Sequence, residues 1–537
     1  MTVTAARLAV AISGSLLVAA CGTTAQAPGA AGARQTGAVT GGTGLGDAAV
    51  GAASNVQPAG GPGSAGDGGG VGPSGGAAGA RTAVTAAAGG TGQRAVAGGT
   101  AATVAAAPGV TATTIAVGLE YSVNSQQAAA ALGAAGGGVG GGDGKAQWEI
   151  LLKDINDHGG ILGRKLVPVW YVDDATSTQS LDQKEQEACA QYTQDHKVFA
   201  VVQAEATTAE TLLNCVSKAG AVQLYEDATR ADATTFQRYP YYLETGDLRM
   251  DRVAAFWPQA LQSQGYFSPW DTTRGASGTL PAKVGIVSFD DPTTVRAVEK
   301  QLEPALKAVG HPAADWIRVQ YPTGEADNGT AISAIEAAEL RFASEGITHV
   351  LPFDAQGAGV GAFFAQGADS QKYYPRYGLS SGNGAQTLVD AGVWPASQLN
   401  GAMGYGWVPL LDLRLGDNPD NGGTSNAARR YCVTLMAKHG QSVGSAIVER
   451  QVTTKCDTLH FLQRALETAG RGVTRDAVVL GANAIGAGFQ SGQTFSTLFD
   501  ASHHDGVAQA RNFAYQSACG CFRYTGGLVR IRDDPAS

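Results

Sequence analysis

The sequence predicts an α/β fold with two doubly wound parallel-sheet lobes, preceded by a long segment that cannot fold. Short apolar strands alternate with amphipathic helices in two successive sets, which is typical of parallel sheets covered on both faces. Residues 22–108 consist almost entirely of Gly, Ala, Thr, Ser and Pro. About 430 residues remain after them, too many for a single core and suited to two lobes.

The first twenty residues have the pattern of an export signal. Arg7 precedes an uncharged run from Leu8 to Ala20, which is too short to span a bilayer. Residues 17–20, directly before Cys21, resemble the bacterial lipobox, and this resemblance implies cleavage before Cys21 and a diacylglycerol anchor on it. The alternative is an ordinary secretory signal with a chance cysteine. Both interpretations export the protein, and the first anchors it by lipid on the extracytoplasmic face of the cell membrane.

Residues 21–108 are predicted to be a flexible tether. They show no hydrophobic periodicity and cannot bury enough apolar area to offset their ordering entropy. Gly-rich chains span roughly 5 to 6 Å times the square root of their length, so the tether would hold its cargo about 50 Å from the anchor. The alternative is that an Ala/Gly-rich genome acquired this low-complexity segment by drift, which would give the same flexible tether without selection for its length.

The first lobe is predicted from a strand and helix that repeat. A buried strand covers Ile115 to Gly118, and apolar residues at helical spacing from Trp148 to Ile155 predict a helix that Gly159 ends. Pro168 lies in the next strand, residues 165–174, where its missing donor is tolerated only at a sheet edge.

The strand order follows from that edge. In a doubly wound sheet ordered 2-1-3-4-5 the second strand lies at the edge. Residues 197–203 and 220–225 supply strands three and four.

The second lobe repeats this pattern. A strand from Val284 to Phe289 leads into a helix whose apolar face runs from Val295 to Leu306 and which Gly310 ends. Residues 348–354 and 376–382 carry later strand ends.

Charge and cysteine content limit the partners and the compartment. The formal net charge is -9 and no basic stripe is visible, so nucleic acid is not an expected partner. We expect a monomer. Six cysteines remain besides Cys21, an even number in an exported chain, which indicates up to three disulfides.

One disulfide follows from the predicted topology. Cys189 lies in the helix before strand three and Cys215 in the helix after it. Right-handed crossovers place these two helices side by side on one face of the sheet, so we expect the two cysteines to pair.

The other four cysteines allow three pairings. We favour Cys432 with Cys456, which lie in flanking segments of one lobe, leaving Cys519 and Cys521 as a tight bridge across Gly520.

Residues 151–177, LLKDINDHGGILGRKLVPVWYVDDATS, resemble the type I periplasmic solute-binding proteins, especially the branch with the leucine/isoleucine/valine receptors of ABC importers. The likeness extends more loosely from Val110 to Ile531. The residues that carry it are Ile155, Asn156, Gly159, Gly160, Ile161, Gly163, Asp173 and Asp174.

The resemblance implies two lobes joined by three crossovers, with a ligand held in the cleft between them. The crossovers would lie near Glu244–Asp247, Gly401–Tyr405 and Cys519–Tyr524. The lobe boundaries that follow are 109–246 plus 404–515 for the first lobe and 247–403 plus 516–537 for the second.

The resemblance also supplies candidate ligand contacts at strand ends. Thr207 occupies the position of a hydroxyl that binds a ligand carboxylate. Thr229 lies where the next loop of the family supplies further backbone and hydroxyl contacts to the ligand. Helix capping is the alternative role for both threonines. Asp291 is expected to cap a helix, leaving its neighbour Asp290 to face the cleft. The candidate ligand-binding residues are Tyr121, Glu205, Thr207, Thr208, Tyr225, Asp227, Thr229, Asp290, Asp354, Gln356, Ser380 and Ser381.

The chain departs from the amino-acid receptors at one position. Where they carry an acidic residue that neutralises the ligand ammonium, this chain has Ser380, Ser381 and Asn383. An unpaired ammonium in a dry cleft is costly, so a branched-chain amino acid is not the expected ligand. The carboxylates that could substitute are Glu120, Glu205, Asp290 and Asp354.

The expected function is therefore solute binding for an ABC permease, with a small polar ligand, no catalysis and no cofactor. One alternative is a ligand-sensing partner of a signalling protein. Another is a secreted serine hydrolase, since GLSSG around Ser380 matches G-x-S-x-G. SHHD at residues 502–505 and the Cys456–His460 spacing suggest metal but form no recognisable ligand set; we expect a surface loop and a disulfide-bonded helix, respectively.

Overall fold

The computed structural model describes residues 107–125, 127, 142–203, 210–226, 230–323, 325–354, 359–390, 392–416, 426–470 and 472–531. The predicted signal, the lipidation site Cys21 and all but the end of the tether lie outside these residues. No helix within the described ranges is long and apolar enough to cross a membrane.

Lobe 1 is built around a five-stranded parallel sheet. Its elements are β1 (Thr114–Val123), α2 (Gly144–Asp157), β2 (Lys165–Asp174), α3 (Leu181–Cys189), the π-helix η1 (Ala190–Asp195), β3 (Ala200–Gln203), α4 (Glu210–Lys218), β4 (Val222–Tyr225), α5 (Ala233–Arg238), β5 (Tyr242–Glu244), α13 (Ala427–Lys438), α14 (Ala446–Ala469) and α15 (Arg475–Ile485). The strand order β2-β1-β3-β4-β5 confirms the predicted 2-1-3-4-5. Pro168 accordingly lies on the edge strand.

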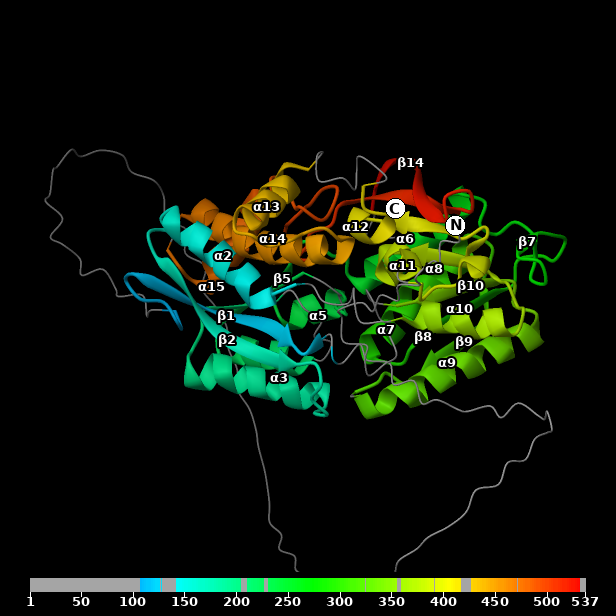
Figure 1. The fold of residues 1–537 in the computed structure, drawn as a ribbon, viewed down its shortest axis with the longest axis horizontal. Helices are drawn as coiled ribbons and strands as arrows, with labels where there is room; N and C mark the ends of the chain where they lie inside the picture. The colour runs from blue at the N-terminus through cyan, green and yellow to red at the C-terminus, as the bar shows by residue number, and fades with distance from the viewer. Residues whose placement is uncertain are drawn as a thin grey trace, which may run out of the picture. The chain divides into compact units, whose positions relative to one another are not determined.

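Helices cover both faces of this sheet. On one face, Val117 and Leu119 of β1 share a core with Trp148 of α2 and Leu459 of α14. On the other, Val201 of β3 packs in a smaller cluster with residues of α3, η1 and α4. Figure 1 shows α2 and α14 on the opposite side of β1 and β2 from α3. The alternation of strand side chains thus places two apolar surfaces against two helical layers.

Lobe 2 is built around a seven-stranded sheet. Its elements are α6 (Met250–Ser263), β8 (Val284–Phe289), α7 (Pro292–Ala297), the π-helix η2 (Val298–Leu302), α8 (Glu303–Ala308), β9 (Ala313–Val319), α9 (Glu325–Glu345), β10 (His349–Phe353), α10 (Val360–Ser370), β11 (Arg376–Ser380), the 3₁₀ turns η3 (Ser381–Asn383) and η4 (Ala396–Leu399), α11 (Ala385–Asp390), β12 (Met403–Gly406), α12 (Pro409–Asp412), β13 (Gln509–Gln516) and β14 (Cys521–Arg530). A hairpin of β6 (Trp270–Asp271) and β7 (Ala276–Ser277) stands apart from the main sheet.

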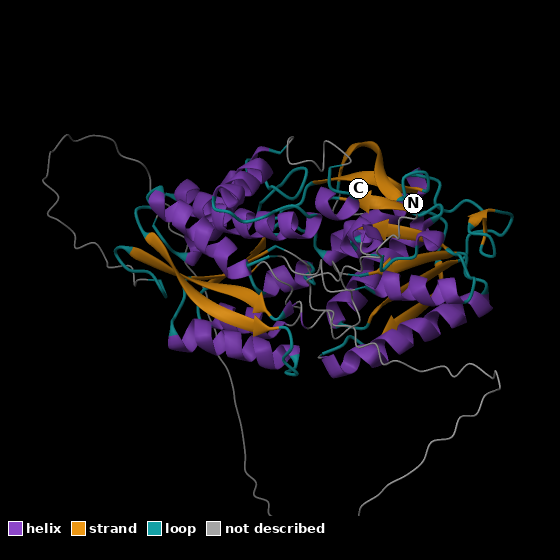
Figure 2. Cartoon of the chain, in the orientation of Figure 1, coloured by secondary structure: helices purple, strands orange, loops and turns teal. Residues whose placement is uncertain are grey.

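The strand order of lobe 2 is β14-β13-β12-β11-β10-β8-β9. Strands β8 to β12 are parallel, whereas β13 and β14 add an antiparallel edge. Ile286 and Leu351 pack toward α6 and α8, while Val287 and Val350 pack toward α9 and α10. In Figure 2 the strands of this sheet lie between helices.

Two of the three predicted crossovers are misplaced. The first holds, since β5 ends at Glu244 and α6 begins at Met250. However, β12 pairs with β11 and β13 pairs with β12, so both belong to lobe 2 and not to a first-lobe segment 404–515. The chain instead passes to lobe 1 after Leu413, in the core of lobe 2, and returns between Phe499, in the core of lobe 1, and Val507.

The physical reason for the error is the sequence MGYG of β12, which reads as a loop because glycine is depleted from strands. Here the glycines allow close approach. A Cβ on Gly404 would lie 2.1 Å from the Leu379 carbonyl oxygen, and one on Gly406 would lie 2.0 Å from a carboxylate oxygen of Asp412.

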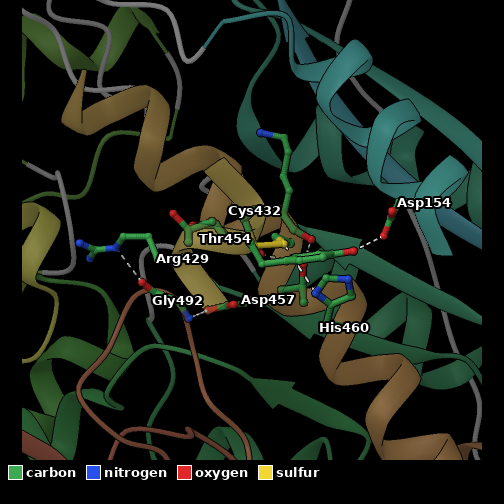
Figure 3. Close-up of a disulfide and its surroundings, with 12 residues drawn as sticks. Asp154, Arg429, Cys432, Thr454, Asp457, His460 and Gly492 are labelled. Carbon is green, nitrogen blue, oxygen red and sulfur yellow. Dashed lines mark hydrogen bonds between the residues drawn. A yellow bond between two sulfur atoms is a disulfide. The ribbon is translucent and has the colours of Figure 1, made fainter. Parts of the chain in front are cut away.

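The disulfides match the favoured pairing. Cys189–Cys215 joins α3 to α4, Cys432–Cys456 joins α13 to α14, and Cys519–Cys521 joins the turn before β14 to the first residue of that strand. Figure 3 shows the second of these beside His460 of α14. The first two therefore cross-link neighbouring helices of lobe 1, each over a separation of more than twenty residues, which restricts the unfolded chain.

Candidate functional site

The ends of the parallel strands carry the polar side chains of interest, because ligands in such sheets bind beyond the carboxyl ends of the strands. Part of the predicted site lies outside the described residues and stays a prediction. These residues are Glu205, Thr207, Thr208, Asp227, Thr229 and Gln356.

Arg230 is the side chain that joins the two lobes at this edge. It follows β4 in lobe 1, yet its Nη1 donates to Oδ2 of Asp291, the N-cap residue of α7 in lobe 2, at 3.2 Å. Its guanidinium carbon lies 3.9 Å from the ring centroid of Tyr321 and 5.5 Å from that of Phe289. The arginine thus has one carboxylate and two aromatic rings of the other lobe around it.

We call these residues, with two more that act on Arg230, the interlobe cluster. Burial lowers the pKa of Arg230, but Tyr321, Asp291, Asp354 and Tyr225 together raise it above its usual value. Arg230 therefore stays charged. The interlobe cluster comprises Tyr225, Arg230, Phe289, Asp291, Tyr321 and Asp354.

A second ion pair runs in the reverse direction. Nε of Arg296, on α7 of lobe 2, donates to Oδ2 of Asp232 at 2.7 Å. Asp232 is the N-cap of α5 in lobe 1 and also accepts from the Thr235 backbone N–H at 2.9 Å. Hydrogen bonds to Arg296 and to Thr235 outweigh burial and lower the pKa of Asp232. The segment before α5 and helix α7 are thus joined by two ion pairs, and each of them supplies one arginine and one aspartate.

Of the predicted tyrosines, one lies in the interlobe cluster and one does not. Tyr225 is buried with Phe236 and Tyr242 in a small apolar cluster of lobe 1, and it lies near enough to Arg230 to contribute to the raised pKa of that residue. Tyr121 is half-buried and packs edge-on against Trp170, with the ring centroids 5.7 Å apart. Its described contacts give it a packing role.

The two predicted carboxylates of lobe 2 accept hydrogen bonds from backbone N–H groups. Asp290 is exposed, and its Oδ1 accepts from the Tyr321 N–H at 2.9 Å, which ties the end of β8 to the segment after β9. Asp354 is buried after β10, and its Oδ2 accepts from the Val360 N–H at the start of α10 at 3.0 Å. Asp354 keeps a place in the interlobe cluster through its charge.

Ser380 and Ser381 do not have the expected ligand-facing position. Ser380 is buried, and its Oγ accepts from the Gly382 N–H at 3.2 Å. Ser381 Oγ donates to Asp412 Oδ1 at 2.7 Å and accepts from the Trp407 N–H at 2.8 Å. Both serines brace the turns after β11 and β12, since buried hydroxyls need partners.

Glu120, the remaining carboxylate considered from sequence, is bound within lobe 1. It lies buried near the end of β1, and its Oε2 accepts from Gln203 Nε2 at 3.1 Å. Gln203 Oε1 in turn accepts from Gln223 at 2.6 Å. These bonds run across β1, β3 and β4 and fix the strand ends relative to each other.

A group of buried carboxyls lies where the chain leaves lobe 1. Glu226 follows β4 and accepts from the hydroxyl of Thr245, just after β5. Asp247 accepts from the indole N–H of Trp407, in lobe 2, at 3.0 Å. We name the hinge cluster as the set Glu226, Thr245, Asp247, Trp407, Asp457 and Ser491.

Asp457, on α14, is the best-bonded acid of the hinge cluster. Its Oδ2 accepts from Ser491 Oγ and from the Gly492 N–H, each at 2.7 Å; Figure 3 shows the bond to Gly492. Burial raises the pKa of Asp457 to about 7. Burial and the charge of Asp457 hold the pKa of Glu226 well above its usual range.

The residues that suggested a metal site or a hydrolase make structural contacts in the protein. Cys456 is bonded to Cys432, so neither sulfur is a thiolate that could hold a metal beside His460. No histidine contacts Ser380 within the described part of the chain. Ser502 lies at the surface as expected, whereas His504 and Asp505 are buried and Asp505 pairs with Arg252 of α6 at 2.7 Å, so SHHD is only partly a surface loop and belongs to the third crossover.

Comparisons with known proteins identify the fold. No family model and no curated protein matches the chain. Several solved structures do, at low identity. Three of them are an ABC transporter substrate-binding protein of Aeropyrum pernix (11% identity, 78% of this chain and 97% of that chain, TM-score 0.55), a solute-binding protein of Rhodopseudomonas palustris BisB5 in complex with 3,4-dihydroxy benzoic acid (13%, 79% and 99%, 0.53) and a branched-chain amino acid ABC transporter protein of Thermus thermophilus with bound valine (16%, 78% and 97%, 0.52).

The fold is that of the type I periplasmic binding proteins. This confirms the two-lobe α/β architecture that the sequence predicted. Sequence reasoning missed Arg230, Tyr321 and the Arg296–Asp232 pair in this periplasmic-binding-protein fold. The one available signal was an arginine directly after the predicted strand-four loop, and nothing in the sequence showed that it would meet Asp291, sixty-one residues away.

Proposed function

We propose that the chain is a lipid-anchored, extracytoplasmic solute-binding protein that delivers a small polar ligand to an ABC importer. The observation that carries the proposal is the interlobe cluster, in which Arg230 of lobe 1 meets Asp291 and Tyr321 of lobe 2 at the strand ends. Charged and aromatic side chains of two lobes gathered there suit the capture of a polar molecule between them.

The similar structures support the role without fixing the ligand. The three proteins are named as parts of ABC transporters, and the two with bound molecules hold 3,4-dihydroxy benzoic acid and valine. One fold thus accommodates different solutes, as expected when function depends on a site and not on the fold.

Ligand binding is tested by a thermal-shift screen of amino acids, organic acids, sugars and polyamines against the folded domain. A bound solute at a hundred times its dissociation constant adds about 2.7 kcal/mol to the stability. Small-angle scattering with the best solute should then show a smaller radius of gyration, because a ligand bridging two lobes favours their closure. A confirmed ligand with an unchanged radius of gyration would contradict the closure.

The anchor and the partner need separate tests. Cys21→Ala should release the protein from the membrane fraction if Cys21 carries the lipid, and mass spectrometry of the N-terminal peptide should find the diacylglycerol on the unmodified chain. Uptake of the identified solute should need both this protein and a permease. Uptake that persists without the protein would favour the sensor alternative, and reaction of Ser380 with a fluorophosphonate probe would favour the hydrolase.

A further inference from the structure

Arg230 has hydrogen-bonding capacity that its described partners do not use. Its side chain is only 8% exposed. Nη1 is bound to Asp291, whereas Nε is buried and has no hydrogen-bond partner in the described part of the protein. Buried donors in folded proteins are nearly always paired, so an unpaired guanidinium donor in such a place calls for an acceptor.

The geometry of arginine defines that acceptor. A guanidinium is planar and presents its N–H groups in fixed directions, so that Nε and Nη2 form a parallel fork along one edge. Two carboxylate oxygens match this fork and make a bidentate, charge-assisted pair. Asp291 takes the Nη1 position, so the Nε–Nη2 edge is the one left for a second carboxylate.

The surroundings limit the charge of the acceptor. Asp291 already balances the positive charge of Arg230, and Asp354 lies near enough to act on its pKa. Each negative charge of an acceptor is repelled by these carboxylates, and a dianion carries a second charge that the bidentate contact with Arg230 does not offset. A single carboxylate is therefore favoured over a phosphate or a dicarboxylate.

Residues of lobe 2 fix the orientation of the Arg230 guanidinium, and therefore of its Nε–Nη2 edge. The guanidinium lies over the ring of Tyr321 at 3.9 Å, and Asp291 holds its Nη1 end. Both contacts depend on the two lobes meeting, so the edge that would bind a carboxylate is oriented only in the contacted state. Carboxylate binding and lobe contact are thereby linked through one side chain.

We propose that Arg230 is the specificity-determining residue of the site and binds the carboxylate of a monocarboxylic solute through Nε and Nη2. This inference rests on the solute-binding role proposed above and names the class of solute. An arginine is required, because lysine provides a point charge without the fork.

The test uses pairs of probes that differ only at the carboxylate. Thermal shift and calorimetry would compare benzoate with benzamide, 4-methylpentanoate with its amide and leucine with leucinamide, with succinate and inorganic phosphate as dianions. We expect a carboxylate to bind and its amide to bind at least about 10-fold more weakly, the loss expected for one charge-assisted bidentate contact. The dianions should be rejected.

The matched variants are Arg230→Lys and Arg238→Lys. Arg238 lies on α5, in the same part of lobe 1, and makes an exposed ion pair with Glu210. Arg230→Lys should lose about 10- to 100-fold in affinity for the carboxylate probe and lose the preference over the amide, while its circular dichroism matches that of the unmodified protein. Arg238→Lys should retain both the affinity and the preference.

The outcomes separate this inference from the function on which it rests. Equal binding of a carboxylate and its amide, or carboxylate binding by a folded Arg230→Lys at full affinity, overturns the role of Arg230. Selective binding of a sugar or a polyamine overturns the carboxylate class and leaves solute binding intact. If no solute of any class binds the unmodified protein, the proposed function falls together with the inference.

Discussion

Glu226 of the hinge cluster and Arg230 of the interlobe cluster both follow β4, yet the two clusters differ in how they accommodate buried charge. In the interlobe cluster, Arg230 pairs with Asp291 across the lobes. In the hinge cluster, the carboxyls Glu226 and Asp457 lie close enough for one to raise the pKa of the other, and both pKa values are raised.

This difference decides what each cluster responds to. An arginine–carboxylate pair keeps its charges over the whole physiological pH range, so it responds to separation of the lobes and to salt. Carboxyls with raised pKa values carry protons near neutral pH, so they respond to pH. Ion pairs thus join the two lobes at the interlobe cluster, whereas the acids with raised pKa values bond residues near the points where the chain leaves and re-enters lobe 1.

The largest effect is expected for removal of the best-bonded acid of the hinge cluster. Asp457→Ala leaves the hydroxyl of Ser491 and the N–H of Gly492 without their acceptor and opens a cavity beside Glu226. We expect a loss of roughly 2 to 4 kcal/mol in the free energy of unfolding, measured by urea denaturation. Glu467→Ala, an exposed site on the same helix, serves as control and should change little. A loss below that of the control would show that the acid is not needed.

The next effect is a pH dependence that comes from the hinge cluster and not from the interlobe cluster. Asp457 has a folded-state pKa raised to about 7, against about 3.9 in the unfolded chain. The unfolded state therefore releases its proton first, and the stability that this group contributes is present below pH 4 and lost as pH rises through about 7. Unfolding free energy should fall between pH 5 and pH 8 by on the order of 2 to 3 kcal/mol.

The substitution Asp457→Asn isolates this contribution. The amide keeps an acceptor for Ser491 but does not titrate, so urea midpoints at pH 5, 6, 7 and 8 should vary less than in the unmodified protein. Burial raises the pKa of Asp412 to about 7 and also raises the pKa of Glu226, so these two carboxyls should supply the residual slope. An identical slope in the two proteins would remove Asp457 from the pH response.

The smallest effect is expected at the second ion pair. Arg296 is partly exposed, so Arg296→Gln should cost about 1 kcal/mol or less, and 1 M NaCl should weaken the unmodified protein by a similar amount. Small-angle scattering of this variant should show a larger radius of gyration, because α7 loses one of its charge contacts with lobe 1. Arg238→Gln should leave both quantities unchanged. An equally large change in Arg238→Gln would mean that the effect is general surface charge.

Sequence reasoning succeeded where the information is local. Pro168 predicted an edge strand, and the helix spacing of Trp148 and its neighbours predicted α2. Cys189 and Cys215 followed from strand order and crossover handedness, and they are paired in the structure. Each of these inferences uses periodicity, one residue's backbone chemistry or a topological rule that holds for nearly all parallel sheets.

It failed where a residue's role depends on distant segments. The resemblance placed a crossover at MGYG of β12, whereas in the structure the Leu379 carbonyl and the Asp412 carboxylate leave no room for a side chain at its glycines. Ser381 looked free to face a ligand, but Asp412, thirty-one residues later, takes its hydroxyl.

Side-chain periodicity and short-range topology were enough to predict the two-lobe α/β fold, the order of the first sheet and the Cys189–Cys215 pair, whereas the other four cysteines left three pairings open. The positions where the chain crosses between the lobes, and the pairs of charges that meet, became visible only in the folded protein. Arg230 is an ordinary loop arginine until folding brings Asp291 and Tyr321 against it. The energy of a charge depends on its partners and on burial, and both are properties of the assembled lobes and not of the residue.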